Sequence, residues 1–326
     1  MSNIYKATEE NIRRAAEIIK RGGLVAFPTE TVYGLGANAL NSEAAAKIFE
    51  AKRRPFFDPL ISHISEVGDI WRIAQTPLPP LAKELAQAFW PGPLTLVLPK
   101  ADDLPDIITS GLATAAVRMP AHPVAARLLK VAGVPIAAPS ANTFGSISPT
   151  TAEHVYEDLG AAAEMILDGG PCSVGVESTI VAVADNHLTL LRPGGITSEE
   201  LAAFGTLAHA PAGDAVTSPG MLPYHYAPKK PVYIVAAAGD MPLNDEDAAF
   251  LFFRKADYHQ ANINEERAAV LSEDGDLREA AANVFACLHK LDKSSAKRIF
   301  AEAVPQKDLG LAIMDRLSRA AKKTEM

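Results

Sequence analysis

The sequence contains little cysteine, few aromatic residues and no long apolar run. Its two cysteines, Cys172 and Cys287, are far apart and match neither a disulfide framework nor a zinc-binding spacing. No segment approaches the roughly 18 apolar residues of a membrane-spanning helix, and residues 1–6 contain no apolar signal core. We therefore expect a protein of a reducing compartment, located in the cytoplasm.

The sequence also lacks an excess of positive charge. Lys and Arg number 31 against 39 Asp and Glu, which gives a formal net charge of −8. A protein whose whole surface follows a nucleic-acid backbone is more often basic, so this balance disfavours such a role and leaves room only for a local basic patch. With 326 residues, 48% of them apolar, the chain has ample core for two domains.

Strand-like and helix-like segments alternate through residues 1–205. Thr8 is the predicted N-cap of a helix that ends at Gly22–Gly23, and Ser42 is the predicted N-cap of a helix that ends before Pro55. Strands are predicted at 24–27, 60–64, 94–98, 115–118, 136–138, 165–167, 178–183 and 188–191, and further helices at 80–90, 123–132 and 151–159. This mixture predicts an α/β architecture around a twisted sheet.

A Pro- and Gly-rich stretch at 206–230 has no periodicity and is typical of a linker. Alternation then resumes, with strands predicted at 232–235, 250–253 and 298–300 and helices at 277–291 and 309–321. The sequence therefore predicts a domain at 1–205, a linker at 206–230 and a smaller α/β domain at 231–326.

The segment after the first strand, Pro28–Ala39, is unusually polar for a turn. Its Gly34-x-Gly36-x-x-Ala39 pattern fits the dinucleotide fingerprint, but that fingerprint needs a helix to open at the motif, and the next helix begins only at Ser42. The G-x-x-x-x-G-K-[ST] phosphate loop is absent from the sequence. A bound nucleotide would therefore be held in another way.

Several cations lie beside predicted strands or helix ends. Lys52 and Arg54 fit either a solvated helix terminus or, held by the neighbouring Phe and Pro residues, an anion site. His63 fits a core histidine better than a ligand. Arg118 ends an apolar strand and must pair with either a structural carboxylate or a ligand carboxylate.

Small polar and Gly-rich segments follow other strands, at 137–149, 168–179 and 191–195. Each alone fits an ordinary loop. Together at one sheet edge, they would form a hydroxyl-lined, cationic cleft suited to a polyanion and a small polar substrate. No Ser-His-Asp order or cysteine nucleophile is indicated, so catalysis would depend on positioning and electrostatics.

These segments resemble a known family in their order along the chain. The motifs are Pro28–Gly36, Lys52-x-Arg54-Pro, Pro59-Leu-Ile-x-His63, Val117-Arg118-x-Pro120, Pro139-Ser140-x-Asn142 and Arg192-Pro-Gly194. They are similar to the YrdC-like domain. Ser218–Met221, His225–Pro228 and Gly310–Arg316 resemble the longer, two-domain form of the threonylcarbamoyl-AMP synthase family.

The resemblance implies a fold and a reaction. The fold is a twisted α/β sheet with an open cationic cleft, joined by a long linker to a smaller Rossmann-like domain. The enzyme is a nucleotidyltransferase that forms threonylcarbamoyl-AMP and pyrophosphate from L-threonine, bicarbonate or CO2, and ATP. Mg2+ is the expected companion of ATP. Downstream enzymes would transfer the threonylcarbamoyl group to tRNA, and direct tRNA contact stays open.

The resemblance also assigns residues. Thr31, His63, Arg118, Ala138 and Ser178 would surround threonine. Lys52, Arg54, Ser140, Asn142, Ser148 and Arg192 would hold ATP, with Asp58 and Thr114 nearby and Tyr226 reaching the nucleotide. Lys52 and Arg54 are the expected catalytic cations. Asp58 stands where the family usually has Asn, so its role stays open, and no metal ligand is assigned.

Alternative interpretations remain. The linker is either a passive tether or a lid over the cleft. The chain is either this synthase, another carbamoyl- or adenylyl-transfer enzyme with a different acceptor, or an RNA-binding module. The acidic net charge and the aromatic content of 6% disfavour the last of these.

Overall fold

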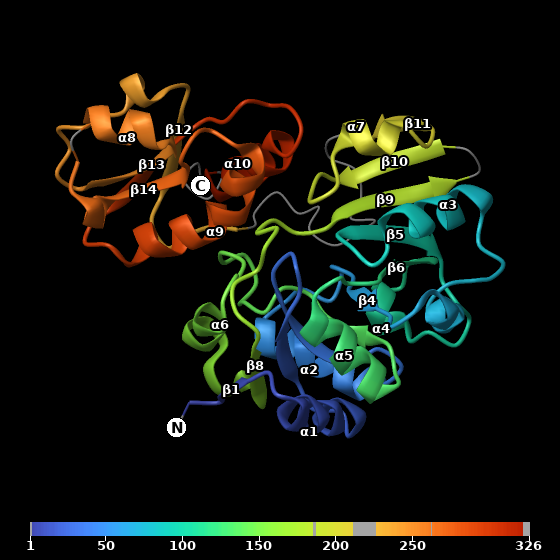
Figure 1. The fold of residues 1–326 in the computed structure, drawn as a ribbon. Coiled ribbons are helices and arrows are strands. Elements are labelled where there is room, and N and C mark those ends of the chain that lie inside the picture. The colour runs from blue at the N-terminus through green and yellow to red at the C-terminus, as the bar shows by residue number, and fades with distance from the viewer. Residues whose placement is uncertain (1, 185–186, 211–225, 262, 322–326) are drawn as a thin grey trace. The chain divides into compact units, whose positions relative to one another are not determined.

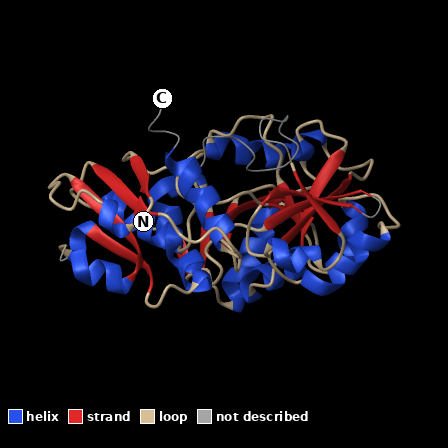
Figure 2. Cartoon of the chain, turned by 90° about the horizontal axis from the view of Figure 1, so that it is seen from above, coloured by secondary structure: helices blue, strands red, loops and turns tan. Residues whose placement is uncertain are grey.

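A computed structural model describes residues 2–184, 187–210, 226–261 and 263–321 (Figure 1). The chain divides into two compact units. Unit 1 contains Met1–Phe144, Pro149–Ser173 and Glu177–Met221, and unit 2 contains Gly145–Ser148, Val174–Val176 and Leu222–Met326. Figure 2 shows the strands of each unit flanked by helices, so the predicted α/β class is confirmed.

Unit 1 is built on an eleven-stranded mixed sheet with the order β1-β8-β2-β3-β7-β4-β6-β5-β9-β10-β11. The strands are β1 Ile4–Lys6, β2 Val25–Pro28, β3 Tyr33–Asn38, β4 Ile61–His63, β5 Leu94–Pro99, β6 Thr114–Arg118, β7 Ile136–Ala137, β8 Met165–Asp168, β9 Thr179–Ala184, β10 His187–Arg192 and β11 Thr206–His209. The helices are α1 Glu9–Lys20, α2 Ser42–Lys52, α3 Pro80–Phe89, α4 Asp106–Thr109, α5 Pro123–Ala132, α6 Ala152–Leu159 and α7 Ser198–Ala202.

Helices cover both faces of β2, which explains why this strand is apolar throughout. Val25 and Phe27 pack into a core cluster with α1 and α5, whereas Ala26 points to the opposite face and joins a cluster with α2. Successive strand residues face opposite sides of a sheet, so a strand covered on both faces reads as a continuous apolar run. The turn that follows β2 is therefore anchored in the core.

The structure corrects several local predictions. Asn41, not Ser42, caps α2, because the Asn41 side chain accepts hydrogen bonds from the backbone N–H groups of Glu43 and Ala44. Residues 33–38, expected as a loop, form β3 and pair antiparallel with β2. Residues 206–209, expected as linker, form β11 at the edge of the sheet. The short elements β1, α4 and α7 were not predicted.

Unit 2 contains a four-stranded parallel sheet in the order β12-β15-β13-β14. Its strands are β12 Val232–Val235, β13 Ala248–Arg254, β14 Ala268–Ser272 and β15 Arg298–Glu302, and its helices are α8 Lys255–Ala261, α9 Leu277–Lys293 and α10 Gly310–Ala321. β14 and α8 were not predicted. Among the described residues, no helix has the length and apolarity needed to cross a membrane.

Candidate active site

Arg118 is the centre of a buried polar cluster in unit 1. It ends β6, and its Nη1 donates to the Thr31 hydroxyl at 2.9 Å while its Nε donates to the Gly92 carbonyl at 3.2 Å. Its Nη2 lies 2.7 Å from Oε1 of Glu30. Thr29, in the same turn between β2 and β3, shares a hydroxyl hydrogen bond with Thr31 at 2.8 Å. A structural carboxylate therefore pairs with Arg118.

His63 lies beside Arg118 in the parallel register of β4 and β6. It is buried, and its ring meets that of Phe27 edge to face with centroids 6.4 Å apart. Burial, followed by the charge of Arg118, lowers the pKa of His63 to about 3. His63 is therefore neutral near pH 7 and suits hydrogen bonding rather than proton transfer.

The polar row continues across the neighbouring strand. β5 pairs antiparallel with β6, and Leu96 is opposite Val117. One further step along this register brings Thr95 level with Arg118. His63, Arg118 and Thr95 therefore occupy three adjacent strands at one level of the sheet.

Ser178, directly before β9, and Arg192, at the end of β10, continue the polar cluster. The Ser178 hydroxyl lies 2.7 Å from that of Thr95, and Arg192 Nη2 donates to the Ser178 carbonyl at 2.8 Å. The turn after Arg192 lies directly against this backbone, because a Cβ added to Gly194 would lie 2.3 Å from the Glu177 carbonyl oxygen. Only glycine permits this approach, which explains the Arg-Pro-Gly pattern.

Lys52 is a second buried cation, at the last residue of α2. Its Nζ donates to the carbonyls of Ser140, at 2.6 Å, and Asn142. Burial and then the nearby Arg54 charge lower the pKa of Lys52 to about 7. The structure thus brings Lys52, Ser140 and Asn142 together, as expected for one site.

Arg54 is held by the chain that follows it. Its Nη2 lies 2.8 Å from Oδ2 of Asp58, and it also donates to the carbonyls of Asp58 and Pro59. Asp58 is fully buried, so its carboxylate serves as an ion-pair partner of Arg54. The register of β4 and β6, extended by two residues, brings the half-buried Thr114 level with Pro59.

Ala138, Gly34 and Gly36 line the join between β3 and β7. The Ala138 N–H donates to the Ile61 carbonyl at 2.9 Å. A Cβ added to Gly36 would lie 2.7 Å from a ring carbon of Phe27, and one added to Gly34 would lie 3.1 Å from Ala138 Cβ. The two glycines therefore give space to protein side chains in this structure.

Two assigned residues, Ser148 and Tyr226, belong to unit 2. The Ser148 carbonyl lies 3.2 Å from His289 Nε2, on α9. Tyr226 has a φ of 67° and is buried; its ring lies 5.5 Å from that of Phe285 and 5.0 Å from the Arg316 guanidinium. Most of the predicted linker, including Tyr224 and His225, lies outside the described residues.

Sequence reasoning missed two members of the cluster, Glu30 and Thr95. The sequence signal for Glu30 was its position between two threonines, in a turn that is buried. Thr95 had one as the single polar residue of an apolar strand. Neither partner could be identified from sequence, because Glu30 and Thr95 each pair with residues more than 80 positions away.

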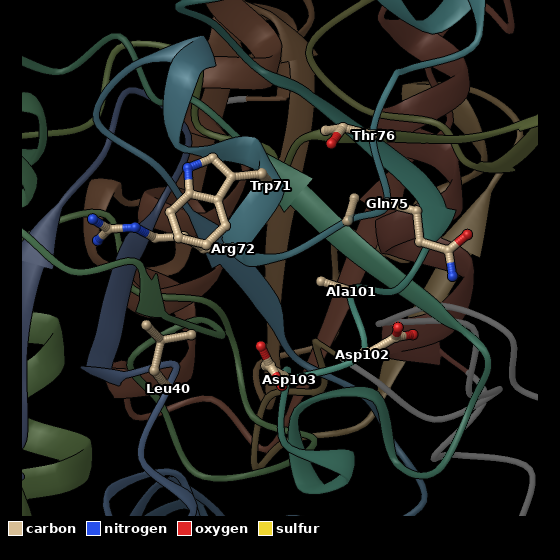
Figure 3. A pocket seen from close by; sticks show the side chains of 9 residues that line it. Leu40, Trp71, Arg72, Gln75, Thr76, Ala101, Asp102 and Asp103 are labelled. Atoms are coloured by element: carbon tan, nitrogen blue, oxygen red, sulfur yellow. The ribbon is translucent and has the colours of Figure 1, made fainter.

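A hollow of about 680 Å³ lies elsewhere in unit 1 (Figure 3). It is lined by Leu40, Trp71, Arg72, Ala74, Gln75, Thr76, Ala101, Asp102 and Asp103. No residue assigned to threonine or ATP is part of it, so the size of this hollow does not identify the site. Within the described residues, no three His, Cys, Asp or Glu side chains gather as a metal site.

Two family models together match nearly the whole chain. Residues 17–194 match the family of Sua5, YciO and YrdC, described as "Telomere recombination", and residues 196–322 match "Threonylcarbamoyl-AMP synthase, C-terminal domain". The chain belongs to the threonylcarbamoyl-AMP synthase family. The resemblance drawn from the sequence motifs is thereby confirmed.

Relatives named threonylcarbamoyl-AMP synthase are similar over their full length. The protein of Pyrococcus abyssi is 43% identical, with 98% of this chain and 96% of the relative covered. The protein of Bacillus subtilis is also 43% identical, with 96% of this chain and 93% of the relative covered. The protein of Schizosaccharomyces pombe is 35% identical, with 96% of this chain and 89% of the relative covered.

Solved structures support the same assignment. The crystal structure of P. abyssi Sua5 complexed with L-threonine has a TM-score of 0.89 and 41% identity, covering 98% of this chain and 96% of that chain. E. coli YciO has a TM-score of 0.53 and 22% identity, covering 60% of this chain and 96% of that one, which shows a shared fold alone. Both synthase domains are thus present in one chain.

Proposed function

We propose that this chain condenses L-threonine, bicarbonate or CO2, and ATP into threonylcarbamoyl-AMP and pyrophosphate. The observation that carries the proposal is the full-length similarity to a synthase whose structure contains L-threonine, together with the buried arginine cluster of unit 1. A cation beside hydroxyl groups suits an amino acid that has both a carboxylate and a hydroxyl group.

For threonine, we propose a site at Thr31, His63, Arg118, Ala138 and Ser178. Arg118 would bind the α-carboxylate through two donors, and the hydroxyl groups of Thr31 and Ser178 provide both donors and acceptors. His63 is neutral near pH 7, so it adds no second positive charge. The hydrogen bonds from Arg118 to Thr31 and between Thr95 and Ser178, and the register that brings His63 and Thr95 beside Arg118, support one shared site.

For ATP, we propose that Lys52, Arg54 and Arg192 supply cations and that Ser140 and Asn142 supply polar contacts, with Thr114 and Asp58 nearby. Ser148 and Tyr226, which belong to unit 2, stay expectations from the family resemblance. Lys52 uses two of its three N–H donors on carbonyls, which leaves one for a phosphate oxygen. Asp58 would act through Arg54, because its carboxylate already pairs with that side chain.

The proposed chemistry has two steps. The neutral threonine amine forms a nitrogen–carbon bond to CO2 while one carbon–oxygen π bond of CO2 opens, and the nitrogen then loses a proton to solvent to give a carbamate. A carbamate oxygen then forms a bond to the α-phosphorus, and the bond from that phosphorus to pyrophosphate breaks. The cations would offset the charge that develops on the phosphates.

Mg2+ would enter this reaction as part of the MgATP substrate. In the part of the chain that the structure describes, no three His, Cys, Asp or Glu side chains gather as a metal site, and Asp58 faces Arg54. The phosphates of ATP are oxygen ligands that suit Mg2+. The product would pass to a transferase that acts on tRNA.

The test is pyrophosphate release from ATP with Mg2+ and bicarbonate, with L-threonine, L-serine or L-valine or with no amino acid. We expect release that needs threonine and bicarbonate together. Release with another amino acid would instead support a related transfer enzyme. Tight, salt-dependent RNA binding without ATP consumption would contradict the proposal.

A further inference from the structure

The Glu30 carboxylate holds two parts of the arginine site at once. Its Oε1 lies 2.7 Å from Arg118 Nη2, and its Oε2 accepts a hydrogen bond from the Ala121 backbone N–H at 3.1 Å. Ala121 follows β6 by three residues, so Glu30 fixes both the arginine and the chain leaving its strand. The side chains of Arg118 and Glu30 are only 4% and 9% exposed, so solvent screens this ion pair little.

The arginine keeps donors for a ligand despite these contacts. A guanidinium has five N–H groups. Gly92 and Thr31 each accept a hydrogen bond from one of these groups. The ion pair between Nη2 and Glu30 is not aligned as a hydrogen bond, but we count it as occupying a third N–H group. Two N–H groups remain, one on each terminal nitrogen. A pair of N–H groups on the two terminal nitrogens can bind both oxygens of a carboxylate, and we call this pair the fork.

We propose that Glu30 is the positioning residue of the substrate site: it orients Arg118 so that this fork binds the α-carboxylate of the amino-acid substrate. This inference rests on the proposed function. Burial opposes ionisation of Glu30, but the Arg118 charge and hydrogen bonding outweigh it and lower the pKa of Glu30. Glu30 is therefore a carboxylate near pH 7.

Two effects of Glu30 oppose each other. Its negative charge weakens the attraction of Arg118 for a second carboxylate, whereas its contacts fix the fork in place. If charge dominated, removing it would tighten amino-acid binding. If orientation dominates, as we propose, removing it weakens binding, because a misplaced donor pair loses most of its bidentate contact.

The test compares Glu30→Gln and Glu30→Asp with Glu10→Gln, a matched control at an exposed position of α1. Steady-state kinetics give kcat and the KM for threonine and ATP, and thermal unfolding gives Tm. Glu30→Gln should raise the threonine KM by about 10- to 100-fold, by analogy with the loss of a carboxylate that supports a metal-binding side chain. The ATP KM should change by less than about 2-fold, and Glu10→Gln should match the wild type.

Several results would overturn the proposal. The first is a threonine KM that is unchanged or lowered in Glu30→Gln. The second is an equal rise in the threonine KM and the ATP KM together with a lowered Tm, which would indicate a general structural role. If Glu30→Gln does not fold, Glu30→Asp takes its place, because it keeps the charge but withdraws the carboxylate. It should raise the threonine KM by a smaller factor, and an unchanged value would overturn the proposal.

The wild-type arm separates this inference from the proposed function. Threonine-dependent pyrophosphate release by the wild type supports the proposed reaction whatever Glu30 does. If the wild type releases none, the reaction itself is overturned. If it releases pyrophosphate and the variants match it, only the role of Glu30 is overturned.

Discussion

Arg118 and Lys52 are both buried cations of unit 1, but different groups face them. Arg118 lies against the Glu30 carboxylate, whereas the Lys52 Nζ donates to the carbonyls of Ser140 and Asn142. A carboxylate cancels a full positive charge, while carbonyl dipoles only solvate it. The Arg118–Glu30 pair is therefore neutral overall. The Lys52 amine keeps a positive charge, and burial makes it easier for this amine to lose its proton.

This difference suits the two ligands proposed for the site. An amino acid carries no net charge, so a neutralised but well-oriented arginine can select its carboxylate through geometry. A triphosphate is a polyanion, and a lysine solvated by carbonyls can offer it charge. Binding of the phosphates should also raise the pKa of Lys52 from about 7, because an opposite charge favours the protonated amine.

The largest expected effect is the difference in unfolding free energy between Arg118→Met and Lys52→Met. Arg118→Met leaves the Glu30 carboxylate buried without its cation, which typically costs about 3–5 kcal/mol. Lys52→Met removes a desolvated charge and leaves two carbonyls short of donors, so we expect a loss below about 3 kcal/mol. Urea unfolding gives both free energies.

The double variant Glu30→Gln/Arg118→Met is the control. It removes both charges and should be more stable than Arg118→Met alone, because no unpaired carboxylate then stays buried. The losses of the two single variants should therefore not add up to the loss of the double variant. Equal losses in Arg118→Met and Lys52→Met would show that the carboxylate makes no difference and would remove the contrast.

The second prediction concerns pH. The pKa of Lys52 is about 7 in the folded state against 10.5 as its ordinary value, so between these values the unfolded state binds more protons. Stability should therefore rise with pH from about 7 to 10.5 and stay level, for this group, below 7. The free energy of unfolding of the wild type, relative to Lys52→Met, should increase from pH 7 to pH 9 in urea titrations.

A level difference between the two proteins over that range would mean that Lys52 keeps its ordinary pKa. The double variant Glu30→Gln/Arg118→Met offers the matching control. The wild type compared with this variant should show no such rise, because Lys52 is present in both proteins.

Local sequence signals predicted most of the fold but not the pairing of its charges. Thr8 caps α1 as expected, since an N-cap depends on residues two or three positions away. β3 was missed because glycine disfavours strands, and no local pattern shows that Phe27 and Ile136 pack against Gly36. The Glu30–Arg118 contact joins residues 88 positions apart, and no local pattern encodes such a choice.

The smallest predicted effect tests the start of α2, the helix that ends at Lys52. Asn41→Ala removes the side-chain oxygen that accepts from two backbone N–H groups, at 3.0 and 3.1 Å, and should cost about 1 kcal/mol. Ser42→Ala, at the residue first expected to be the cap, should cost less, because alanine suits the first helical position. Urea unfolding of both variants gives the order, and the reverse order would place the helix start one residue later. Because α2 carries Lys52 and not Arg118, the loss should also speed amide hydrogen exchange in α2 while leaving β6 unchanged.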